Sequence, residues 1–151
     1  MDNLQDLNDL FDMLHDRVIV SAVENNPNIE LKVGIQYLAE LINKDFEYFF
    51  IELKNVQNLS FDAWTDEPLI IINPKEIFNL ELEILSAEIY ETGNLLVHCR
   101  CFNSLENLFS GGKLIFKCDD FEILDEARKP ITLDKLKELA THYWDDIFGK
   151  N

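Results

Sequence analysis

Residues 29–37 alternate strictly between apolar and polar side chains, and this alternation constrains the fold more than any other feature of the chain. The apolar positions are Ile29, Leu31, Val33, Ile35 and Tyr37, and the positions between them are Glu30, Lys32, Gly34 and Gln36. Successive side chains of a β-strand point to opposite faces of a sheet. The segment is therefore predicted to be a strand with one buried face and one face in water.

Five further segments are rich in branched and aromatic residues and are also predicted to be strands. They are residues 17–24, 46–59, 80–90, 95–102 and 113–124. Turn-forming sequences join several of them, such as residues 25–28 (Asn-Asn-Pro-Asn) and residues 91–94 (Glu-Thr-Gly-Asn). Connections this short favour antiparallel neighbours. We therefore expect an antiparallel sheet of about six strands.

Both ends of the chain show helical periodicity, because apolar residues recur there every three or four positions. The two segments are residues 3–14 and 132–148. Residue Thr132 is suited to cap the second helix. The predicted fold class is α+β, with an N-terminal and a C-terminal helix packed on the sheet. The length of 151 residues, with no repeat or linker, predicts one domain over residues 1–151.

The charge of the chain limits its partners. It carries 29 acidic and 13 basic residues, a formal net charge of −16. Such a field repels nucleic acid and anionic membrane surfaces and attracts basic proteins. No run approaches the roughly 18 apolar residues of a membrane-spanning helix. Only three cysteines are present, which suits a reducing compartment, so we expect a cytoplasmic protein with a basic protein partner.

No arrangement of residues predicts catalysis or metal binding. The segment His98-Cys99-Arg100-Cys101 holds two thiols that share one face of a strand, whereas His98 points the other way. Adding Cys118 gives three metal ligands and no fourth. Phosphate-binding loops and nucleophile elbows are absent from the sequence. We therefore expect no enzyme activity, no metal and no cofactor.

Two short segments combine acidic side chains with tryptophan, a composition typical of binding surfaces. The candidate partner-binding residues are Asp62, Trp64, Asp66, Glu67, Trp144, Asp145 and Asp146. The first four lie in residues 60–79, a segment without sustained periodicity. The alternative is that the two tryptophans only cover the core.

The segment Leu14-His15-Asp16-Arg17-Val18-Ile19 and the step Leu53-Lys54-Asn55-Val56, placed among alternating strands, resemble small bacterial proteins of the YxiG-like or Imm50-like kind. The resemblance covers roughly residues 10–125. It implies a sheet-rich fold, no catalytic residues and, for some members, a role as immunity proteins of toxin systems. We therefore expect a non-catalytic immunity protein that binds and neutralises a cationic toxin domain, such as a nuclease. The alternatives are a scaffold or subunit that binds another host protein, and a small-molecule binder or unrecognised enzyme.

Overall fold

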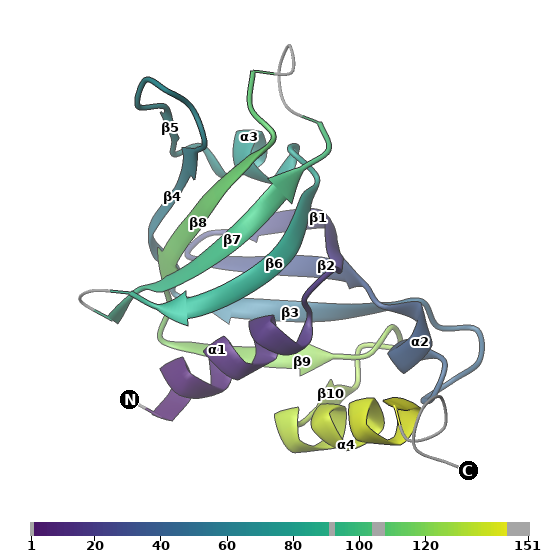
Figure 1. Ribbon diagram of the computed structural model, residues 1–151. Helices are drawn as coiled ribbons and strands as arrows, with labels where there is room; N and C mark the ends of the chain where they lie inside the picture. Colours follow the sequence, from purple (N-terminus) through teal and green to yellow (C-terminus); the bar gives the residue numbers. More distant parts are fainter. Residues whose placement is uncertain (1, 91–92, 104–107, 145–151) are drawn as a thin grey trace.

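The alternating segment forms strand β2 (Asn28–Gly34) in the computed structural model, which describes residues 2–90, 93–103 and 108–144 (Figure 1). Its apolar side chains Ile29, Leu31 and Val33 are buried, whereas Glu30 and Lys32 are partly exposed. The predicted strand is therefore confirmed as far as Gly34, whereas Gln36 and Tyr37, predicted to continue it, begin a short helix. Strand β2 pairs with β1 (Val18–Asn25) on one side and with β3 (Tyr48–Lys54) on the other.

The described residues form an antiparallel sheet of ten strands in the order β10-β9-β3-β2-β1-β6-β7-β8-β4-β5. The remaining strands are β4 (Gln57–Ala63), β5 (Ile70–Ile71), β6 (Leu82–Ile89), β7 (Leu95–Cys101), β8 (Gly111–Lys117), β9 (Asp120–Leu124) and β10 (Pro130–Ile131). The predicted class, α+β with an antiparallel sheet, is confirmed. The expected count of about six strands is wrong.

The count differs because two of the predicted runs are each divided by a sharp corner. Residues 46–59 hold β3 and the start of β4, with Asn55 between them at a φ of 55°. Asparagine adopts this left-handed backbone more readily than most residues. Residues 113–124 hold most of β8 and all of β9. The two further strands, β5 and β10, are only two residues long and leave no periodic signal.

The two corners are hydrogen-bonded to each other. The Asp119 N–H donates to the Lys54 carbonyl over 2.9 Å, and the Asn55 side-chain Nδ2 donates to the Asp119 carboxylate over 2.6 Å. Strand β3 pairs with β9 and β4 pairs with β8, so the two bent strands remain neighbours through the corner. The sheet therefore turns back over itself, with β1, β2, β3 and β9 in one half and β4, β6, β7 and β8 in the other (Figure 1).

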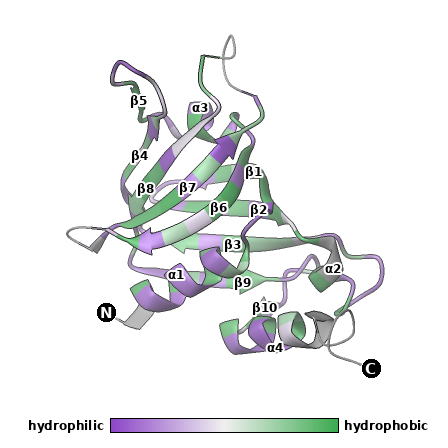
Figure 2. Cartoon of the chain, in the orientation of Figure 1, coloured by the Kyte–Doolittle hydropathy of each residue, from purple (hydrophilic) through white to green (hydrophobic). Residues whose placement is uncertain are grey.

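Helix α1 (Asp2–Met13) confirms the predicted N-terminal helix and packs along β6. Its residues Leu7, Leu10 and Phe11 are buried, and the Phe11 ring lies 6.0 Å from the ring of Phe116 on β8. Figure 2 shows hydrophilic and hydrophobic residues alternating along the surface of this helix. Its burial stabilises the fold by roughly 1.5–3 kcal/mol for each large apolar side chain.

Helix α4 (Leu133–Trp144) forms near the predicted C-terminal position, and the Lys135 N–H donates to the Thr132 hydroxyl over 3.0 Å as the expected cap. Its side chains Leu136 and Leu139 are buried. The main neighbours of α4 are α1 and the short helix α2 (Gln36–Ala39). The expectation that α4 packs on the sheet is therefore revised, because it packs chiefly on two helices. No helix in the described ranges has the length and apolar character needed to cross a membrane.

Candidate protein-binding surface

The predicted acidic segment, residues 62–67, leaves the sheet at the end of β4. The Trp64 N–H donates to the Gly111 carbonyl on β8 over 2.9 Å, and the Ala63 N–H donates to the Leu69 carbonyl over 3.0 Å. The second bond closes the intervening residues into a loop, inside which the Thr65 hydroxyl donates to the Glu67 carbonyl. The loop is therefore fixed to β8 at its start and closed by the bond between Ala63 and Leu69.

The Trp64 side chain is anchored on one side and open on the other. A Cβ atom placed on Gly111 would lie only 2.5 Å from the Trp64 ring, so the ring packs directly against the glycine backbone. The residue remains 43% exposed. A rigid aromatic side chain with a fixed seat and an exposed part is typical of an interface hot spot. The alternative, that Trp64 covers the core, concerns the packed side of the ring, whereas the binding hypothesis concerns its exposed side.

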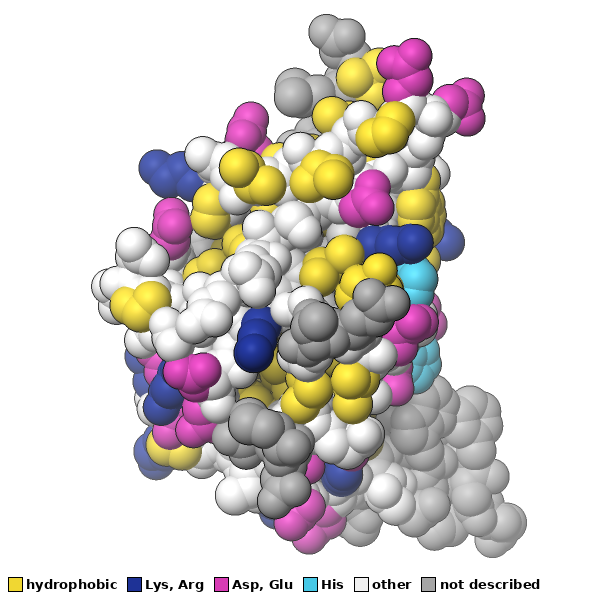
Figure 3. Space-filling model, turned by 90° about the vertical axis from the view of Figure 1, so that its left-hand side faces the viewer, with side chains coloured by type: hydrophobic (Ala, Val, Ile, Leu, Met, Phe, Trp, Pro, Cys, Tyr) yellow, Lys and Arg dark blue, Asp and Glu magenta, His cyan; other side chains and the backbone are white. Residues whose placement is uncertain are grey.

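Further apolar side chains are exposed at the same end of the molecule. We define the end surface as Trp64, Ile70, Ile72, Phe102 and Leu108, all of which are exposed. Ile72 is the most open, at 71%. Backbone contacts connect the segments that carry these residues: Ile70 pairs with Asp62 on β4, the Trp64 N–H donates to the Gly111 carbonyl, and the Cys101 N–H donates to the Ser110 carbonyl. Figure 3, which views the molecule from the side of β4 and β5, shows hydrophobic side chains spread over its upper part.

The acidic residues of the segment differ in their surroundings. Asp62 lies within β4, partly buried, between Ile70 of β5 and Lys113 of β8 in the strand register. Asp66 and Glu67 are exposed in the loop, and neither has an ion-pair partner among the residues that the structure describes. Their charges are therefore available to a partner.

Trp144, the one residue of the second predicted patch that the structure describes, does not lie at this surface. Trp144 is the last residue of α4, and Asp145 and Asp146 lie outside the described residues. Helix α4 lies at the end of the molecule opposite to β5 (Figure 1). Trp64 and Trp144 therefore do not belong to one site.

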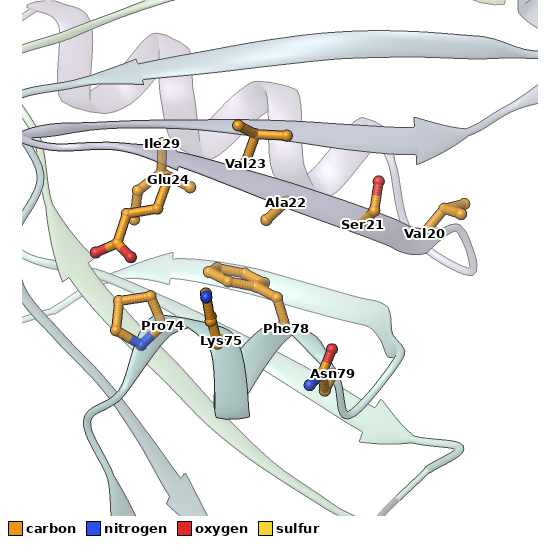
Figure 4. A pocket seen from close by; sticks show the side chains of 10 residues that line it. All are labelled: Val20, Ser21, Ala22, Val23, Glu24, Ile29, Pro74, Lys75, Phe78 and Asn79. Atoms are coloured by element: carbon orange, nitrogen blue, oxygen red, sulfur yellow. The ribbon is translucent and has the colours of Figure 1, made fainter.

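A groove lies beside the end surface, between β1 and helix α3 (Pro74–Phe78). Its volume is about 580 Å³, and Figure 4 shows its walls. The lining residues are Val20, Ser21, Ala22, Val23, Glu24, Ile29, Pro74, Lys75, Phe78 and Asn79. Helix α3 begins at Pro74 and is capped by Asn73, whose side chain accepts the Glu76 N–H over 3.2 Å. The Asn73-Pro74 step was a local signal for α3, but no sequence pattern indicated the groove.

A row of three glutamates crosses neighbouring strands in the half of the sheet that contains β2, β3 and β9. Glu30, Glu52 and Glu122 stand opposite one another on β2, β3 and β9. Directly opposed like charges destabilise a sheet. Arg128 donates two hydrogen bonds to the Glu30 carboxylate, over 2.7 and 2.9 Å, and packs over the Phe50 ring at 4.4 Å. These contacts with Glu30, together with the charge of Glu52, raise the pKa of Arg128.

The thiols have the arrangement that the strand pattern predicted. Cys99 and Cys101 are buried, whereas His98 and Arg100 on the opposite face meet Glu88 and Glu83 at 3.2 and 3.3 Å. Burial raises the pKa of Cys99 strongly and that of Cys101 to about 11. Thiols that stay protonated at neutral pH are poor nucleophiles. Among the residues that the structure describes, no group of three or more His, Cys, Asp or Glu is placed to hold a metal ion.

Comparison of the chain with models of known protein families, with curated proteins and with solved structures found no match in any of the three. The resemblance to YxiG-like or Imm50-like proteins stays a prediction.

Proposed function

We propose that this chain is a non-catalytic protein-binding domain of the immunity type, which binds a basic toxin domain and neutralises it. The observation that carries the proposal is the end surface, where the seated Trp64 ring lies next to a loop that bears two unpaired carboxylates, Asp66 and Glu67. An exposed apolar cluster beside charged groups is typical of a protein interaction site.

Charge supports a basic partner. The net charge of −16 raises the encounter rate with cationic proteins. A nuclease domain holds nucleic acid in a basic cleft, and exposed carboxylates such as Asp66 and Glu67 can take the place of phosphates there. Trp64 supplies contact area that loses water on binding, which is where most binding energy arises. Steering by the acids and anchoring by the tryptophan therefore act together in this proposal.

The exposed apolar side chains also favour a second candidate, a subunit that binds another host protein permanently, because permanent interfaces are more apolar than transient ones. The two candidates differ in their consequence for the cell. An immunity protein protects against a toxin, whereas a permanent subunit does not.

The test is protection from a toxin in living cells. The basic C-terminal domain of a secreted protein encoded beside this chain is expressed alone and together with the chain. We expect the domain to stop growth, the chain to restore growth, and the Trp64→Ala variant to protect poorly. Tyr90→Ala is the matched control, since Tyr90 is 42% exposed, close to the 43% of Trp64, and lies outside the end surface, directly after β6. A domain that is harmless, or a chain that binds it without restoring growth, would contradict the immunity role.

A further inference from the structure

Strand β1 has a free edge along most of its length. It pairs with β6 at Val18 and Glu83, and the Ile84 N–H donates to the Arg17 carbonyl over 2.8 Å. Past this point the two strands separate. Within the described ranges, residues 20–24 pair with β2 alone, so the opposite edge of β1 has no strand partner.

The continuation of β6 along this edge is replaced by helix α3. The register that pairs Val18 with Glu83 would place residues 77–81 opposite residues 20–24. Those residues form the end of α3 and a turn, and their N–H groups bond within it: Asn79 to the Lys75 carbonyl and Leu80 to the Ile77 carbonyl. Helix α3 therefore lies beside β1 without offering it a strand.

The edge of β6 beyond its contact with β1 is protected, in contrast to the edge of β1. On that part of β6, the carboxylate of Asp12 on α1 accepts the Ala87 N–H over 2.9 Å. An unprotected strand edge is a template for pairing with another chain, and natural proteins usually cover it. The open edge of β1 therefore requires an explanation.

The groove along this edge has the chemistry of a peptide site. Figure 4 shows the Phe78 ring directed from α3 toward β1, with Ala22 and Glu24 directed toward α3. Val23, on the same strand, is 62% exposed. Glu24 on β1 and Lys75 on α3 stand on opposite walls, and neither has an ion-pair partner among the residues that the structure describes. The volume of about 580 Å³ is within the range of ligand sites.

We propose that this groove binds an extended, basic segment of the partner protein, which adds to the sheet as a strand along the free edge of β1. Backbone hydrogen bonds to residues 20–24 supply the affinity, and the apolar floor around Ala22 and Phe78 accepts alternate side chains of the segment. Glu24 selects a Lys or Arg of the segment. A second copy of the chain is disfavoured as the occupant, because each copy carries a net charge of −16. The inference rests on the proposed function in that the occupant belongs to a basic protein.

The test uses a pool of capped eight-residue peptides in which Lys alternates with Val, Leu, Ile or Ala. Amide hydrogen exchange of the intact chain is followed with and without the pool. We expect groove-facing amides of residues 20–24 to exchange about tenfold more slowly when the peptide is present at ten times its Kd, because only the free fraction exchanges. Two further peptides separate strand addition from side-chain binding: one is N-methylated at its odd positions and the other at its even positions. A strand that adds to a sheet hydrogen-bonds through one of its edges only, so one of the two methylated forms should fail to bind.

Two variants should change peptide affinity in opposite directions. Glu24→Lys should raise the Kd, and Lys75→Glu should lower it, each by roughly 2- to 5-fold at low salt, the range of an exposed ion pair. Glu40→Lys is the control, because Glu40 is exposed and lies outside the groove. It should leave the Kd unchanged.

Two results would exclude strand addition: no slowing of exchange at residues 20–24, or equal binding of both methylated peptides. A third result, slowing of exchange that depends on the concentration of the chain itself, would also overturn the inference, because it would indicate a second copy as the occupant. Its failure is distinguishable from failure of the proposed function. Trp64→Ala should reduce protection from the toxin without changing peptide affinity. Protection that persists while the peptides do not bind would remove the groove and leave the immunity role.

Discussion

Reversing the charges of Asp66 and Glu67 to lysine should slow association with a basic partner and leave dissociation almost unchanged. Both side chains are exposed, and neither has an ion-pair partner in the described part of the chain, so the double variant breaks no ion pair there. Asp62 is left intact because it lies partly buried on β4, opposite Lys113 of β8. A lysine there would face a like charge across the strands and test the stability of the sheet.

The magnitude follows from the exposure of the two acids. An exposed ion pair is worth about 0.2–1 kcal/mol, so two pairs contribute about 0.4–2 kcal/mol. Since about 1.4 kcal/mol is a factor of ten, the association rate constant should fall by roughly 2- to 30-fold at low salt. The difference should vanish near 1 M salt, where the Debye length is only about 3 Å.

The assay is stopped-flow association of the purified chain with the basic partner domain across a series of salt concentrations. The matched control carries Glu40→Lys and Asp45→Lys, two exposed acids in and after the turn that follows α2, with the same change in net charge. Trp64→Ala should instead accelerate dissociation, with little dependence on salt, because it removes buried contact area. Equal slowing by the control pair would show that net charge acts without a docking face. An unchanged rate in the Asp66 and Glu67 variant would exclude the end surface as the point of steered encounter.

Three further predictions concern the fold. Burial raises the pKa of Cys101 and of Cys118 to about 11, against roughly 8.5 for an unfolded thiol, so these two thiols should leave the stability unchanged below about pH 8 and lower it as the pH rises toward 11. Denaturant titrations between pH 8 and pH 11 measure this loss, and a flat profile over that range would contradict it. Deleting residues 131–151 removes two buried leucines of α4, each of which contributes about 2–4 kcal/mol to a free energy of unfolding of roughly 5–15 kcal/mol. The truncated chain should therefore lose its cooperative thermal transition, and an unchanged melting temperature would refute this. Arg128→Ala should lower the melting temperature more at low salt than near 1 M salt, because Arg128 offsets the repulsion between the opposed glutamates and salt screens that effect. An equal loss at both salt concentrations would show that the packing of Arg128 on Phe50, not its charge, is what matters.

The elements that the sequence predicted are those with a repeating local signal. Strand β2 follows from the alternation of Ile29, Leu31 and Val33, and α1 from the helical spacing of its leucines. Such patterns depend only on which side chains share a face of a strand or helix. The corner at Asn55 was hidden, because the residues on both sides of it are equally suited to strands. Its left-handed backbone is fixed by tertiary hydrogen bonds that join β3 and β4 to β8 and β9.

For the candidate site, the residues alone indicate the chemical character: the chain is acidic, and an aromatic side chain, Trp64, lies in an acidic segment without periodicity. Which of these groups come together depends on the fold. It packs Trp64 on Gly111, gathers the five apolar side chains of the end surface at one end and leaves Trp144 at the other. The groove beside β1 has no counterpart in the sequence, because it arises where β1 and β6 separate after Val18. That separation depends on pairing between residues about 65 positions apart, which a local pattern does not encode.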